Sequence, residues 1–177
     1  METKKMILES FYRLLSQKSF EDIRVESILQ DSGVSRSTFY RHFQDKYDLM
    51  NSYYQNFFDS LQYDSQKDSW TDLIQLTLTF LSQHADYFQQ AFKTKGQNTF
   101  SEFLYHYCYD FTSRIYLQKI NKTQLTPLEK DLITSICAGN IRVVINWFER
   151  NLQETPEELT QHLLLSFPEA LNIILDS

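Results

Sequence analysis

The strongest indication of the fold of this chain is GVSRSTFYRHF at residues 33–43. The segment before it, 25–32, carries apolar residues at helical spacing. Gly33 ends that segment, because the turn requires a backbone conformation that costs other residues energy. Ser35 is then a good N-cap for a second short helix over 36–43. The pattern predicts a helix-turn-helix, although a short helix, a glycine and another short helix also occur together in many other all-α proteins.

The second helix of this motif is predicted to expose six side chains. Each of them can donate a hydrogen bond, and none of them is acidic. They are Arg36, Ser37, Thr38, Tyr40, Arg41 and His42. In a recognition helix the N-terminal residues point at base edges in the major groove. Arg36 is suited to guanine O6 and N7, and Ser37 and Thr38 to bases, a thymine methyl group or phosphate. The later residues suit phosphate, and Lys46 adds a cation to the first turn of the next helix, where free N–H groups favour an anion.

The residues over roughly 4–50 resemble the N-terminal domain of TetR-family transcriptional regulators. The resemblance is carried by FEDIRVESI at 20–28, by GVSRSTFYRHF at 33–43 and by DKYDLM at 45–50. It implies an all-α homodimer in which three N-terminal helices bind DNA and the rest of the chain binds a ligand and dimerises. On this resemblance the DNA contacts include Thr38, Tyr40, His42 and Lys46, and the core includes Phe39 and Phe43.

The motif departs from the family pattern at two positions before the turn. Arg24 stands where Ser or Thr usually caps the first helix, so a cap worth about 1 kcal/mol is lost, but Arg24 can reach a phosphate. Glu26 either accepts a hydrogen bond from cytosine N4 or simply favours the helix N-terminus. The predicted DNA-binding residues are Arg24, Ser35, Arg36, Ser37, Thr38, Tyr40, Arg41, His42 and Lys46.

The rest of the chain also has helical periodicity, which predicts an all-α fold of about nine helices. Gly and Pro number three each among 177 residues, whereas average usage gives roughly 20, and many-stranded sandwiches or barrels need more turns. Capping boxes with Pro at the first helical position open helices at about 127–151 and 156–175, and Pro168 predicts a kink or break in the second. We expect a helix-turn-helix domain over 1–48 and a helical-bundle effector-binding and dimerisation domain over 49–177.

The C-terminal two-thirds is also similar to a domain of Gram-positive TetR-like regulators that includes activators of dihydroxyacetone-kinase operons. The similarity lies in GQNTF at 96–100 and in AGN at 138–140 followed by Val143, Val144 and Trp147. Of 27 aromatic residues, 20 lie beyond residue 50, so the bundle is suited to enclose an apolar or aromatic effector. The alternative is that these aromatics form plain core. The candidate pocket residues are Tyr54, Phe58, Phe80, Phe103, His106, Tyr107, Asn140 and Trp147.

The last two long helices are the expected dimer interface. A single recognition helix contacts few bases, and two-fold pairing places two of them in successive major grooves. The alternative is that their apolar stripes only close the core of one chain. The predicted interface residues are Leu132, Ile136, Val143, Val144, Trp147, Leu159, Leu163, Phe167, Leu171 and Ile174.

The net charge of −6 at first argues against a nucleic-acid binder. Residues 1–50 are neutral, however, with eight basic and eight acidic side chains, and residues 51–177 hold nine against fifteen. Residues 36–46 carry a local charge of +2. The acidic excess therefore belongs to the predicted effector domain.

Other function classes find little support in the sequence. Enzyme signatures such as GxSxG, a P-loop and HExxH are missing, and the histidines have no metal-ligand spacing, so we expect no catalytic residue, cofactor or metal. With neither a signal peptide nor a membrane span, we expect a cytoplasmic protein. The sequence thus predicts a TetR-like homodimer that binds a pseudo-palindromic DNA operator through 36–43 and responds to an unidentified small molecule. The alternative is a ligand-sensing co-regulator that acts mainly through a protein partner.

Overall fold

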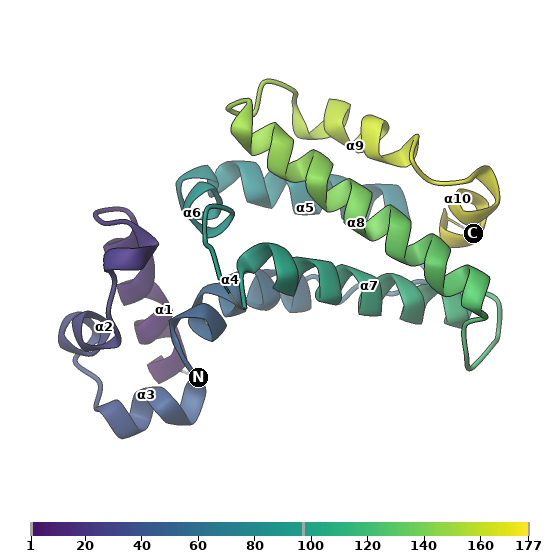
Figure 1. Cartoon of the computed structure of the whole chain (residues 1–177). Coiled ribbons are helices and arrows are strands. Elements are labelled where there is room, and N and C mark those ends of the chain that lie inside the picture. The colour runs from purple at the N-terminus through teal and green to yellow at the C-terminus, as the bar shows by residue number, and fades with distance from the viewer. Residues whose placement is uncertain (1, 97, 177) are drawn as a thin grey trace. The chain divides into compact units, whose positions relative to one another are not determined.

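The computed structural model describes residues 2–96 and 98–176, and every regular element within them is helical (Figure 1). The elements are α1 (Glu2–Leu15), η1 (Phe20–Asp22), α2 (Val25–Ser32), α3 (Arg36–His42), α4 (Lys46–Ser60), α5 (Trp70–Gln83), α6 (Ala85–Ala91), α7 (Phe100–Lys119), α8 (Pro127–Glu149), α9 (Pro156–Leu164) and α10 (Glu169–Asp176). The all-α prediction is confirmed. Among the described helices, none is both long enough and apolar enough to cross a membrane.

The chain forms two compact units. The first comprises the chain up to Leu61 together with Ala85–Phe103, and the second comprises Gln62–His84 together with the chain from Leu104 onward. The first unit therefore holds α1–α4 and α6, so it contains the whole predicted helix-turn-helix domain. The division between residues 48 and 49 stays a prediction.

Local capping chemistry starts the helices where the sequence predicts. Ser35 and Asp45 accept hydrogen bonds from backbone N–H groups in the first turns of α3 and α4. Thr126 and Thr155 form complete capping boxes at α8 and α9, each followed by proline. At α8 the backbone N–H and hydroxyl of Thr126 hold the pKa of Glu129 at about 2. These side chains satisfy the N–H groups that a helix N-terminus leaves without partners.

Pro168 divides the predicted helix over 156–175 into α9 and α10. The first helix ends at Leu164, and the second begins at Glu169. Proline has no backbone N–H and its ring clashes with the preceding turn, so it ends a helix rather than continuing it. Its carbonyl still accepts a hydrogen bond of 2.9 Å from the N–H of Leu171. The predicted break at Pro168 is confirmed.

In the first unit, α1 packs against α2, α4 and α6. Phe11 of α1, Ile28 of α2, Phe39 of α3 and Leu49 of α4 are all fully buried. Each of the four helices thus buries at least one apolar side chain, and burial of apolar area is the main stabilising term in such a small core.

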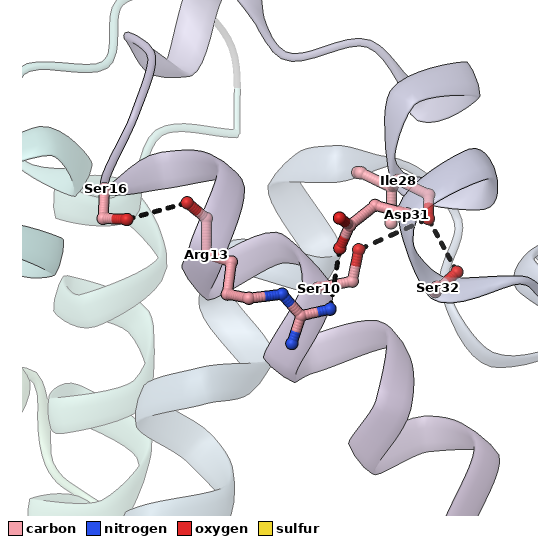
Figure 2. A network of polar contacts seen from close by, with 6 residues as sticks. All are labelled: Ser10, Arg13, Ser16, Ile28, Asp31 and Ser32. Atoms are coloured by element: carbon pink, nitrogen blue, oxygen red, sulfur yellow. Dashed lines mark hydrogen bonds and ion pairs between the residues drawn. The ribbon is translucent and has the colours of Figure 1, made fainter.

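Polar contacts fix α2 on α1, as Figure 2 shows. The hydroxyl groups of Ser10 and Ser32 both donate to the carbonyl oxygen of Ile28, at 3.4 and 2.6 Å. Arg13 of α1 donates to the carboxylate of Asp31 at 2.8 Å. The Ser32 bond lies within α2, whereas the contacts of Ser10 and Arg13 join α1 to α2 and hold the two helices in register.

In the second unit, α5 packs against α9 and α10. Trp70 stacks on Phe111 with ring centroids 6.1 Å apart and meets Phe167 edge-on at 6.4 Å. Trp147 of α8 is fully buried, and its indole N–H donates to the carbonyl oxygen of Glu154 at 2.9 Å. Large aromatic side chains thus form much of this core.

Candidate nucleic-acid interface

The turn between α2 and α3 has the geometry of a helix-turn-helix motif. Gly33 adopts the left-handed conformation, with φ +71°, and its N–H donates to the carbonyl oxygen of Leu29 at 3.0 Å. Ser35 returns to an extended conformation and caps α3. The predicted motif is confirmed, with α3 ending at His42.

Gly33→Ala is expected to destabilise the first unit by about 1–2 kcal/mol, the cost of a left-handed backbone for an L residue. An added Cβ at this position meets no atom within 4 Å, so backbone strain is the whole effect. Gly139→Ala is the matched control, because Gly139 lies within α8 and also has open space at its Cβ. This control is expected to stabilise by about 1 kcal/mol, since alanine favours a helix interior. Denaturant unfolding followed by circular dichroism measures both, and destabilisation of similar size by the two variants would contradict the account.

Three hydroxyl groups gather at the N-terminus of α3. The Oγ of Ser35 accepts from the N–H of Thr38 at 3.1 Å. It also lies 3.0 Å from the Oγ of Ser37 and 2.8 Å from the Oγ1 of Thr38, in hydrogen bonds. Ser35 and Ser37 are exposed and Thr38 is half-buried. The structure thus brings three of the predicted DNA-binding side chains together at one helix end.

Arg36, the first residue of α3, is paired with α2. Its Nη2 donates to a carboxylate oxygen of Glu26, and both side chains are largely exposed. The pKa of Glu26 is lowered, first by the hydrogen bond to its own backbone N–H and then by the Arg36 guanidinium. Glu26 therefore lies at the N-terminus of α2, as one of the two alternatives expected. Its contact with Arg36 is one that the sequence pattern does not predict.

The remaining predicted contacts on this face are Arg24, Tyr40, Arg41 and His42. The Tyr40 ring meets Phe39 edge-on at 5.3 Å but remains 49% exposed. Arg24 and Arg41 are exposed, and neither forms an ion pair with another described residue. Arg24 makes no side-chain cap at α2, as expected of an arginine at this position. Two guanidinium groups are thus available on the surface of this motif.

Lys46 has a different environment from the one expected. Its Nζ donates to the carbonyl oxygens of Phe20, Glu21 and Ile23 at 2.8, 3.3 and 3.0 Å. It also lies 4.3 Å from the centroid of the Phe20 ring. Partial burial lowers the pKa of this lysine. The ammonium therefore ties α4 to the turn before α2, and a phosphate contact from it stays a prediction.

The chain matches known protein families over both halves. Residues 7–53 match the family described as bacterial regulatory proteins, tetR family, and residues 68–167 match the one described as transcriptional regulator C-terminal region. The chain belongs to the TetR family of transcriptional regulators. Its family and its fold are those of regulators rather than of enzymes.

Individual TetR-type proteins are similar to parts or all of the chain. The dhaKLM operon transcriptional activator DhaS of Lactococcus lactis is 30% identical over 91 residues, which are 51% of this chain and 49% of that protein. The matched part thus spans about half the length of this curated relative. A solved structure of a dihydroxyacetone kinase operon activator DhaS aligns over 99% of this chain and 98% of its own, with a TM-score of 0.68 and 21% identity. A TetR regulator from Streptococcus agalactiae aligns over 94% of both chains, with a TM-score of 0.66 and 20% identity.

The predicted effector residues of this TetR protein divide between the two units. In the first unit, the Tyr54 ring lies 5.9 Å from Phe58 and 6.4 Å from Phe103. The second unit holds Phe80, His106, Tyr107, Asn140 and Trp147. Here Trp147 is fully buried and Asn140 accepts a 2.7 Å hydrogen bond from Ser166. The pocket assignment stays a prediction.

The second unit also carries an open cavity of about 620 Å³ along α7. Its described lining is Asp110, Ser113, Arg114, Leu117, Gln118, Asn121 and Lys122, which includes no predicted effector residue. These residues recur at helical spacing along one face of α7 and into the residues that follow it. Because they mix polar and apolar side chains, the sequence pattern there is that of any exposed helix and does not predict a cavity.

Metal-binding side chains do not form a cluster of three or more among the described residues.

Most of the predicted dimer residues of this TetR chain are buried within a single chain. The seven buried ones are Ile136, Val144, Trp147, Leu159, Leu163, Phe167 and Leu171, and Leu132, Val143 and Ile174 are half-buried. On α8 the exposed surface includes Ser135, Ala138, Gly139 and Arg142. The burial of the seven favours the alternative that their stripes close the core of the unit, and their part in a dimer stays a prediction.

Proposed function

We propose that this chain is a ligand-responsive regulator that binds a pseudo-palindromic operator as a homodimer through α3. The observation that carries the proposal is the surface of α3 itself, which begins after the Gly33 turn and contains no acidic residue. Its donors include three hydroxyl groups at one end and the exposed Arg36 and Arg41. Such a helix suits the major groove, where base edges and phosphates accept hydrogen bonds.

The size of α3 supports a homodimer. A helix of seven residues reaches only a few base pairs, and a two-fold pair of such helices reads two half-sites about one helical turn apart. The neutral N-terminal 50 residues limit non-specific attraction to phosphate, so sequence-dependent contacts contribute more of the affinity.

An effector is proposed to act through the second unit by shifting the population of the conformation that binds DNA. The support for this part is the open cavity along α7 and the aromatic content of the chain beyond residue 50. A small molecule that acts in this way binds free and operator-bound protein with different affinity. Titration of both forms by calorimetry tests it, and equal affinities contradict the mechanism.

The operator is tested by selection of genomic DNA fragments on the purified protein at moderate salt. The expected result is an enriched sequence with two inverted half-sites whose centres are about 10 base pairs apart or a multiple of that spacing. Recovery of fragments without any shared sequence would overturn the proposal.

Arg36→Ala and Arg41→Ala are expected to weaken binding in different ways. Arg36→Ala should reduce discrimination at one base position by about tenfold, because a bidentate guanine contact is lost. Arg41→Ala should weaken all DNA sequences alike and reduce the slope of log affinity against log salt by about 1. Fluorescence anisotropy with single-base operator variants measures both. Loss of base discrimination to the same extent in the two variants would show that their roles are assigned wrongly.

A further inference from the structure

Glu26 and Arg36 form an ion pair across the turn of the helix-turn-helix motif. Glu26 lies in the first turn of α2 and Arg36 opens α3, ten residues later. The two side chains are 62% and 58% exposed, so the pair lies at the surface of the motif. Exposed ion pairs contribute little to folding stability. The position of Glu26 in the first turn of α2 explains a carboxylate there, but it does not explain why that carboxylate is paired with Arg36 of the next helix.

The chemistry of guanidinium allows Arg36 to contact Glu26 and a base together. Arginine carries five N–H donors in a rigid planar fork, and the Glu26 carboxylate engages Nη2. The remaining donors can approach O6 and N7 of a guanine without breaking the ion pair. Glu26 thereby limits the orientations of a long side chain that otherwise moves freely at an exposed helix N-terminus.

The carboxylate also has a second effect on DNA binding. A phosphate that approaches Arg36 must come near the Glu26 charge, which repels it, whereas a base edge carries no net charge. Without Glu26, Arg36 is one more cation available to the DNA backbone, and contacts of that kind carry no sequence information. The pair thus favours base recognition over binding to phosphate.

We propose that Glu26 is a specificity-determining positioning residue of the DNA-binding surface, acting through the guanidinium of Arg36. The inference rests on the proposed function, since it requires an operator that α3 reads. On this inference, Arg36 contacts a base pair that contains guanine in the operator.

Glu26→Gln in the full chain tests the inference, with Asp31→Asn as matched control. Asp31 lies on the same helix and also pairs with an arginine, but its partner is Arg13 of α1 (Figure 2). Affinity for the selected operator and for a scrambled duplex is measured over a salt series. Glu26→Gln is expected to strengthen binding to the scrambled duplex, to steepen its salt slope by about 1 and to lower the specificity ratio by about tenfold. Asp31→Asn is expected to leave that ratio unchanged.

A double variant shows whether Glu26 acts through Arg36. In an Arg36→Ala background, Glu26→Gln is expected to change neither the base preference nor the specificity ratio. Provided that the wild-type chain binds the operator, the inference is overturned if Glu26→Gln leaves the specificity ratio unchanged. It is also overturned if Asp31→Asn lowers that ratio equally, or if Glu26→Gln still lowers it in the Arg36→Ala background. A wild-type chain that prefers no operator overturns the proposed function itself, and a thermal melt confirms that each variant is folded.

Discussion

Trp147→Ala is expected to lower the stability of the second unit by about 3–5 kcal/mol, the usual cost of truncating a fully buried large aromatic side chain. The Trp147 ring is 0% exposed and meets Phe148 edge-on at 5.6 Å. Its indole N–H also donates to the carbonyl oxygen of Glu154, which loses this partner in the variant. Because domains of this size are only about 5–15 kcal/mol more stable than their unfolded state, much of the unit's stability is at risk. Thermal unfolding followed by far-ultraviolet circular dichroism measures the change.

Trp147→Phe is the matched control, because it keeps an aromatic ring and removes the indole N–H. We expect it to cost less than the alanine variant, since the cavity is smaller. The same pair of variants tests the two predicted functional roles of Trp147. A Trp147→Ala protein that melts like the wild type but loses dimerisation or effector binding would contradict the core assignment and support a role at an interface or pocket.

Phe39→Ala is expected to unfold the helix-turn-helix motif and thereby abolish operator binding. Phe39 is 0% exposed and packs against Phe43 with ring centroids 5.8 Å apart. Its truncation costs about 3–5 kcal/mol, and it removes the main anchor of a helix that is only seven residues long. Such a short helix is not stable without its tertiary contacts. The loss is measured by denaturant unfolding and by anisotropy with the selected operator.

Tyr40→Ala, one residue later, separates folding from recognition. Tyr40 is 49% exposed, so its substitution is expected to change stability by only about 0.5 kcal/mol. If Tyr40 contacts phosphate, binding to all sequences weakens together while the melt is preserved. Equal destabilisation by Phe39→Ala and Tyr40→Ala would contradict the assignment of Phe39 to the buried face of α3 and of Tyr40 to its exposed face.

Local sequence patterns are sufficient to predict the helices and the turn that defines the motif. Gly33, Ser35, the two capping boxes and Pro168 act through contacts within about four residues, so each can be recognised without knowledge of the rest of the chain. The same local pattern, with its resemblance to a known family, gave the fold class and the surface that α3 presents.

The partners of several of those residues depend on how the helices pack together. Arg36 pairs with Glu26 ten positions earlier, and Lys46 binds carbonyl groups more than twenty positions earlier. Neither contact follows from local spacing, because each depends on how separate helices pack. The apolar stripes of α8 and α9 show the same limit, since a stripe buried against its own chain and one buried against a partner have the same periodicity. Trp147 and Leu159 are buried within one unit, and this burial depends on how the whole core packs. The local sequence pattern does not show which surface covers them.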